Sequence, residues 1–182
     1  MNIYRTWVWR AAYSTHRYIR AAWSNLYRLF GPWSAHLPRE LPPARVVTEM
    51  DKLTYRSDGW RELWDAVGHP CRTQYVLDLI AEGKPQPPRM AMDCDDFASW
   101  AAAVLPSDRL ARVVSLNYIG ADGKLHGHAI CVYLGVETMF RATGNWGDRY
   151  GEHTFTELLQ RVLMLNSSGG VVTSAQLVAW CV

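Results

Sequence analysis

The apolar side chains in the middle of this chain change their spacing once, from a helical repeat to a strand-like one. Four of them follow the i, i+3, i+4, i+7 spacing of a buried helix face: Phe97, Trp100, Ala101 and Val104. Two later runs, 112–119 and 126–136, are rich in residues typical of strands, and the sequence GADGK between them indicates a hairpin turn. A domain with both patterns has to pack a helix on an antiparallel sheet, so we predict an α+β fold.

Further elements are predicted from breaks and turn residues along the chain. A helix begins around Cys94 and runs to Leu105, and one or two short helices precede it. The predicted elements are short helices within 58–82, a third strand at 138–143, a helix at 155–165 and a final short helix at 174–180.

The N-terminal part of the chain differs from the rest in charge. Residues 1–39 contain six of the arginines and no acidic residue, whereas the remainder has an excess of acid. An apolar side and an arginine side alternate at helical spacing up to Gly31, where proline follows. We therefore divide the chain into a basic amphipathic helical arm at 1–31, a proline-rich linker at 32–48 and a catalytic-type domain at 49–182.

The basic arm calls for an acidic or apolar partner. We expect it to dock on another protein or subunit, with a membrane surface as the second possibility. Arginines interrupt it too often for a transmembrane helix or a signal peptide. The four cysteines are widely and irregularly spaced, which indicates reduced thiols and a cytoplasmic or virion location. The sequence contains no motif of a nucleic-acid-binding fold.

Cys94 stands at the predicted start of a helix. Asp93 suits the N-cap position, and Asp96 three residues later makes an acidic variant of the capping box. Unpaired N–H groups and the helix dipole favour a thiolate in this first turn, and the thiolate is the attacking species. The carboxylates of Asp93, Asp95 and Asp96 oppose this by raising the thiol pKa, so a nucleophilic Cys94 needs an imidazolium partner.

His128 is the candidate for that partner. Period-2 alternation places it on one strand face with Ile130 and Val132, and we expect this apolar face to meet the Cys94 helix. His128 would then reach the thiol and act as its base. Asn145 follows the next strand and is the candidate to orient the imidazole, with Asp148 as the competing residue.

The stretches DCDDFA, GHAICVY and GNWG, in this order, resemble transglutaminase-like cysteine peptidases, a papain-like class with small bacterial and phage members. The resemblance covers about residues 50–150. It implies a papain-like core with the cysteine-bearing helix on an antiparallel sheet, and no cofactor or metal. By resemblance, Cys94 is the nucleophile, His128 the general base and Asn145 the orienting residue. Papain's glutamine before the cysteine has no clear equivalent, since Gln74 and Gln86 cannot be assigned, and the second oxyanion donor stays open.

The resemblance implies acyl transfer through a thioester on a protein or peptide substrate. We expect hydrolysis of a peptide bond or a side-chain amide, as in a peptidase, amidase or deamidase. The alternative is a structural or interaction module, such as a phage virion component, that keeps the fold with little or no activity. A metal site built from His126, His128, Cys94 and Asp93 is a weaker interpretation, because the cysteine has no second sulfur or histidine ligand nearby.

Overall fold

The computed structural model describes residues 36–56, 69–119, 125–135, 140–143, 150–167 and 171–178. The predicted basic arm at 1–31 lies outside these residues, and its docking role is therefore still a prediction. The helices are α2 (Pro43–Met50), α3 (Pro70–Ala81), α4 (Cys94–Val104) and α5 (Phe155–Ser167), with short 3-10 turns at Pro88–Met90 and Ser107–Arg109. The strands are β1 (Arg112–Ile119), β2 (Leu125–Leu134), β3 (Phe140–Thr143), β4 (Tyr150–Glu152) and β5 (Val171–Val178).

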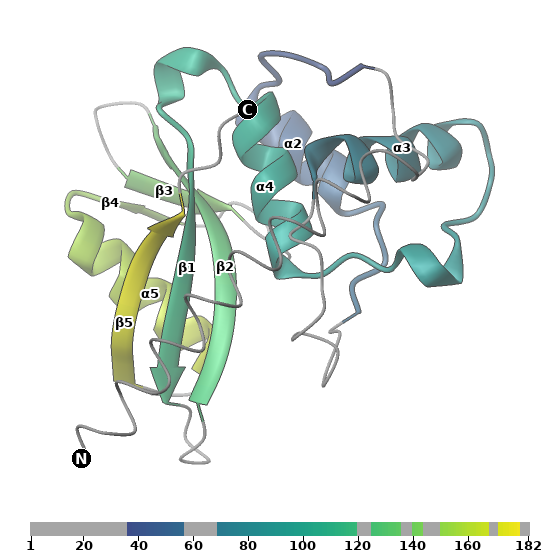
Figure 1. Ribbon diagram of the computed structural model, residues 1–182. Coiled ribbons are helices and arrows are strands. Elements are labelled where there is room, and N and C mark those ends of the chain that lie inside the picture. Colours follow the sequence, from purple (N-terminus) through teal and green to yellow (C-terminus); the bar gives the residue numbers. More distant parts are fainter. Residues whose placement is uncertain are drawn as a thin grey trace.

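The five strands form one antiparallel sheet in the order β4-β3-β2-β1-β5 (Figure 1). β1 and β2 pair without interruption, from Arg112 opposite Val132 to Ile119 opposite Leu125, so the two predicted strands are antiparallel neighbours. The predicted turn at 120–124 lies outside the described residues. β3 continues the meander on the other side of β2. Helices and an antiparallel sheet occur together as predicted, so the α+β class is confirmed.

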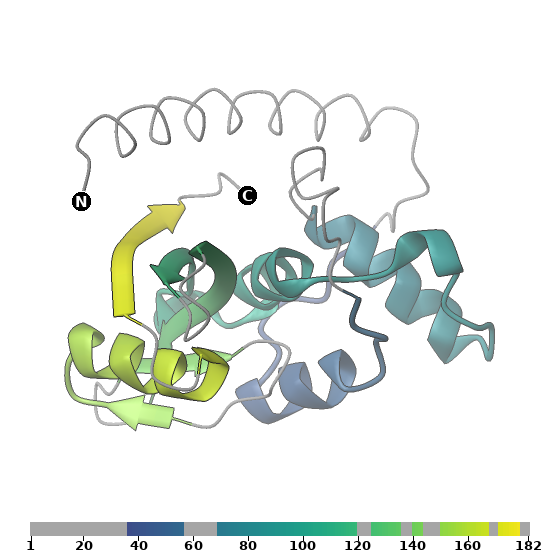
Figure 2. The same ribbon diagram turned by 90° about the horizontal axis from the view of Figure 1, so that it is seen from below.

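The sheet separates two layers of helices (Figures 1 and 2). On one face, α2, α3 and α4 enclose a large apolar cluster that includes the β2 residues Ala129, Cys131 and Tyr133. On the other face, α5 contributes Leu158 and other apolar residues to a second, smaller cluster. Each face of the sheet is thus covered by its own hydrophobic core.

The central helix α4 forms for the reasons that its sequence indicates. The predicted stripe is buried, with Phe97 2% exposed and Trp100, Ala101 and Val104 fully covered. The indole N–H of Trp100 donates to Oε1 of Gln74 at 2.9 Å, which satisfies its polar atom and ties α4 to α3. This stripe fixes how α4 rotates on the sheet, and therefore where its first residue lies.

Two predicted elements need correction. The prediction of a linker at 32–48 is wrong for its second part, because residues 43–48 belong to α2. Pro43 lies in the first turn of this helix, and Val46 and Met50 are buried. Proline suits the first helical position because the N–H it lacks would have no helical partner there. The final helix predicted at 174–180 is also wrong, because β5 pairs with β1 over most of this segment.

None of the described helices combines the length and the apolar character that a membrane-spanning segment requires.

Candidate functional site

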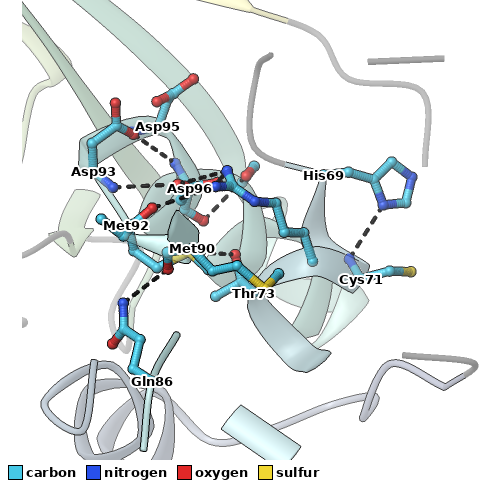
Figure 3. A network of polar contacts seen from close by, with 12 residues as sticks. His69, Cys71, Thr73, Gln86, Met90, Met92, Asp93, Asp95 and Asp96 are labelled. Atoms are coloured by element: carbon cyan, nitrogen blue, oxygen red, sulfur yellow. Dashed lines mark hydrogen bonds and ion pairs between the residues drawn. The ribbon is translucent and has the colours of Figure 1, made fainter. Parts of the chain in front are cut away.

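Cys94 is the first residue of α4, where the sequence predicts it. The Asp93 carboxylate accepts the N–H groups of Asp95 and Asp96 at 3.2 and 3.4 Å. The Asp96 carboxylate in turn accepts the N–H of Asp93 at 3.3 Å, so both halves of the acidic capping box are present (Figure 3). The backbone of this first turn is therefore held on both sides of Cys94.

A buried ion pair supports this turn from the neighbouring helix. Nη1 of Arg72, on α3, lies 3.2 Å from Oδ1 of Asp96, whose side chain is only 2% exposed. The same guanidinium donates from Nη2 to the carbonyl oxygen of Ala91 at 3.5 Å. The sequence gives no sign of this pair, because the two residues are 24 positions apart and follow no periodic pattern.

The Cys94 side chain is a free, partly buried thiol beside strand β2. The backbone N–H of Ala129 and that of Cys94 itself both hydrogen-bond the sulfur, which favours the thiolate. Burial has the larger opposing effect, and the carboxylates of Asp93 and Asp95 add to it, so the pKa of the thiol is raised well above its usual value. At rest, the group is a neutral thiol rather than a thiolate.

The contact with Ala129 places the sulfur next to the strand position that carries His128. The amide nitrogen of Ala129 is bonded to the carbonyl carbon of His128, so the His128 Cα is the next carbon along the chain. β1 pairs with β2 along its whole length. On its other side, β2 pairs with β3 from Cys131 onward. The Cys94 sulfur thus lies beside the backbone of β2 at Ala129, the residue that follows His128.

The prediction that the His128 face of β2 packs against the cysteine-bearing helix is wrong. Alternation is confirmed, but Ile130 and Val132 pack in the α5 cluster, while Ala129 and Cys131 pack under α4. His128 is paired with Leu116 of β1, which also belongs to the α5 cluster. Because side chains alternate along a strand, the His128 side chain leaves the backbone on the α5 side of β2. Both faces of β2 are apolar, so composition could not distinguish them.

His128 is buried, with 8% of its surface exposed. Burial lowers its pKa to about 4, so the imidazole is neutral at physiological pH and able to accept a proton. A neutral thiol and a neutral imidazole differ from the thiolate–imidazolium pair expected from the sequence. Proton transfer from this resting state would have to accompany the attack on a substrate.

Asn145 and its competitor Asp148 lie outside the described residues. The last described residue before them is Thr143, which ends β3 opposite Cys131, three positions from His128 along β2. The Thr143 hydroxyl is buried and finds no hydrogen-bond partner among the residues that the structure describes. The role of Asn145 therefore stays a prediction.

The two glutamines considered for the oxyanion hole are engaged elsewhere. Gln74 accepts from Trp100 and donates to Asp78 at 2.8 Å. Gln86 donates to the carbonyl oxygen of Met90 at 2.9 Å (Figure 3). Its own side-chain oxygen accepts the N–H of Thr54 at 2.7 Å. The donors shown at the sulfur are backbone groups, those of Cys94 and Ala129, and the sequence could not single out the second.

Cation ligation was the weakest interpretation of this region. His126 is the first histidine of the proposed pair, and its side chain lies outside the described part of the structure. Among the side chains that are described, no three or more His, Cys, Asp or Glu residues gather in a way that could hold a metal ion.

Comparisons with known proteins leave the chain without an assigned family. Searches against protein-family models, curated proteins and solved structures find no match.

Proposed function

We propose that this chain is a thiol-dependent acyl-transfer enzyme of the transglutaminase-like, papain-like class, with Cys94 as nucleophile and His128 as base. The observation that carries the proposal is the hydrogen bond from the Ala129 N–H to the Cys94 sulfur. This contact supports a site in which the thiol at the start of the helix lies beside the strand residue that follows His128. His128 itself is buried and neutral. Asn145 remains the proposed orienting residue, on the segment that follows Thr143.

In the proposed reaction, the Cys94 sulfur attacks the carbonyl carbon of a peptide bond or a side-chain amide. His128 takes the thiol proton during the attack and gives it to the departing amine, and a thioester forms as the C–N bond breaks. Water then attacks the thioester, the C–S bond breaks, and the thiol is regenerated. The N–H groups of Cys94 and Ala129 are the available donors to the developing oxyanion.

A second candidate is a structural or interaction module with little or no activity, such as a virion component. Two observations favour it: strand alternation starts His128 on the α5 side, and burial together with Asp93 and Asp95 raises the pKa of the thiol. A buried, protonated thiol with no base in reach would be an inert core residue.

Competitive alkylation of the full-length chain separates the two functions. Iodoacetamide labelling at pH 7.5, followed by peptide mass spectrometry, gives the rates at Cys94 and Cys71, and Cys71 is partly buried to a similar degree. The enzyme predicts that Cys94 reacts at least about 10-fold faster and that His128→Gln removes the difference. The inert module predicts that Cys94 reacts more slowly than Cys71 and that His128→Gln leaves both rates unchanged.

A further inference from the structure

The guanidinium of Arg72 joins the chain entering α4 to the first turn of that helix. Arg72 lies in the first turn of α3, and its Nη1 is 3.2 and 3.4 Å from the two carboxylate oxygens of Asp96. Its Nη2 donates to the carbonyl oxygen of Ala91, two residues before the N-cap Asp93. One side chain from another helix thus spans the point where α4 begins.

Asp96 needs this partner in order to cap the helix. Its carboxylate accepts the Asp93 N–H from a position where the side chain is 2% exposed, and Arg72 itself is 17% exposed. An ionised carboxylate in such a place costs several kcal/mol unless a cation and hydrogen bonds compensate it. The Arg72 guanidinium, with two nitrogen donors in a fixed plane, provides both.

We propose that Arg72 is a positioning residue for the Cys94 thiol, acting through Asp96 and not through contact with a substrate. The proposal rests on the proposed function, since positioning a thiol has a purpose only if that thiol attacks. By holding Asp96, Arg72 fixes the turn on which Cys94 stands. Its positive charge also offsets the carboxylate of Asp96.

The electrostatic part of this role follows from the groups around the sulfur. The charged groups described at the first turn of α4 are those of Asp93, Asp95 and Asp96, together with Arg72 of α3, which pairs with Asp96. The neighbouring strand β2 carries two further titratable side chains, His128 and Cys131. Asp93 and Asp95 already raise the thiol pKa. Removing the Arg72 charge would leave the Asp96 carboxylate without this cation and would raise the thiol pKa further.

The test is the rate of Cys94 alkylation by iodoacetamide between pH 7 and 10, measured in the full-length chain by peptide mass spectrometry. Arg72→Gln is expected to displace the rate profile to higher pH by about 0.5–1 unit, which is roughly a 3–10-fold slower reaction at each pH. The double variant Arg72→Gln/Asp96→Asn removes both charges and should return the profile toward that of the unmodified chain. Arg45→Gln is the matched control, because Arg45 pairs with Glu49 on the exposed side of α2.

A thermal-unfolding scan alone would not distinguish positioning from general support, since both lower stability. The proposal is overturned if Arg72→Gln is folded by circular dichroism and its alkylation profile coincides with that of Arg45→Gln. If Arg72→Gln does not fold, Arg72→Lys replaces it. We expect the lysine to preserve the position of the profile on the pH axis within about 0.3 unit but to slow the reaction, because the two-nitrogen contact is lost. An unchanged rate in Arg72→Lys would contradict the role.

Failure of the proposed function would look different from failure of this inference. The proposed function fails if His128→Gln leaves the alkylation rate of Cys94 unchanged, regardless of the result for the Arg72 variants. The inference fails if the Arg72 variants leave the alkylation rate of Cys94 unchanged, regardless of the result for His128→Gln.

Discussion

The two faces of the sheet are built from different kinds of buried groups. The α5 face packs apolar side chains such as Leu116 and Leu158. The α4 face has a larger apolar cluster, and at its edge it also buries the carboxylates of Asp93 and Asp96 at 8% and 1% exposure. Buried charges are weak contributors to stability, so a core alone does not explain them. The difference fits the proposal that the α4 side positions Cys94, whereas the α5 side supports the sheet and carries His128.

The first way to break this comparison is to truncate one large side chain on each face. Trp100→Ala should lower the free energy of unfolding by about 3–5 kcal/mol, because it empties a fully buried site and leaves the Gln74 oxygen without its donor. Leu158→Ala on the α5 face should cost about 2–5 kcal/mol. Urea unfolding measures both. At equal residual stability, only Trp100→Ala should change the alkylation rate of Cys94, and an equal change from Leu158→Ala would contradict the division of roles.

The second prediction concerns His128, a titratable residue that alternation assigns to the α5 side. Burial lowers the pKa of His128 to about 4, below the 6.5 of an exposed histidine. The unfolded chain therefore binds this proton first as the pH falls. The stability that the neutral His128 contributes is complete above about pH 6.5 and is lost between there and pH 4, by an amount on the order of 2–3 kcal/mol.

His128→Gln measures this contribution directly. Urea unfolding at pH 7 and pH 4.5 should show a smaller acid-induced loss in this variant than in the unmodified chain. His153→Gln serves as the control, because His153 is exposed at the end of β4. Identical acid sensitivity in His128→Gln and the unmodified chain would show that His128 is not buried in its neutral form.

The smallest expected effect concerns the carboxylates beside the sulfur. Asp95 raises the pKa of the Cys94 thiol. Its side chain is not one of the two that form the capping box. Asp95→Asn should therefore speed Cys94 alkylation at pH 8 by roughly 2–5-fold, with a change in unfolding free energy within about 0.5 kcal/mol. A slower reaction would mean that Asp95 acts on the thiol by some route other than its charge.

Much of the α4 face could be predicted because its determinants are local. The cap at Asp93, the stripe through Trp100 and the bounds of β1 each depend on residues within a few positions of one another, and each is confirmed. The helix predicted over 155–165 is confirmed within α5 for the same reason.

What could not be predicted depends on contacts between distant residues. β5 contains a short apolar run that suits a helix or a strand equally, and its pairing with β1 decides the outcome. The face of β2 that meets α4 was ambiguous because both faces are apolar. The Arg72–Asp96 pair joins two helices with no repeat in the sequence to indicate it. Proline content also obscured α2, whose first turn accommodates Pro43.

The most direct test of the account is the distance from the Cys94 sulfur to the nearer ring nitrogen of His128 in a crystal structure of the chain with Cys94 alkylated by a peptide-like electrophile. The account predicts that the imidazole turns around the edge of β2 and lies within about 4 Å of the sulfur, close to hydrogen-bond range. An imidazole that stays in the α5 cluster, with β2 between it and the sulfur, would contradict the proposed chemistry and leave the inert module.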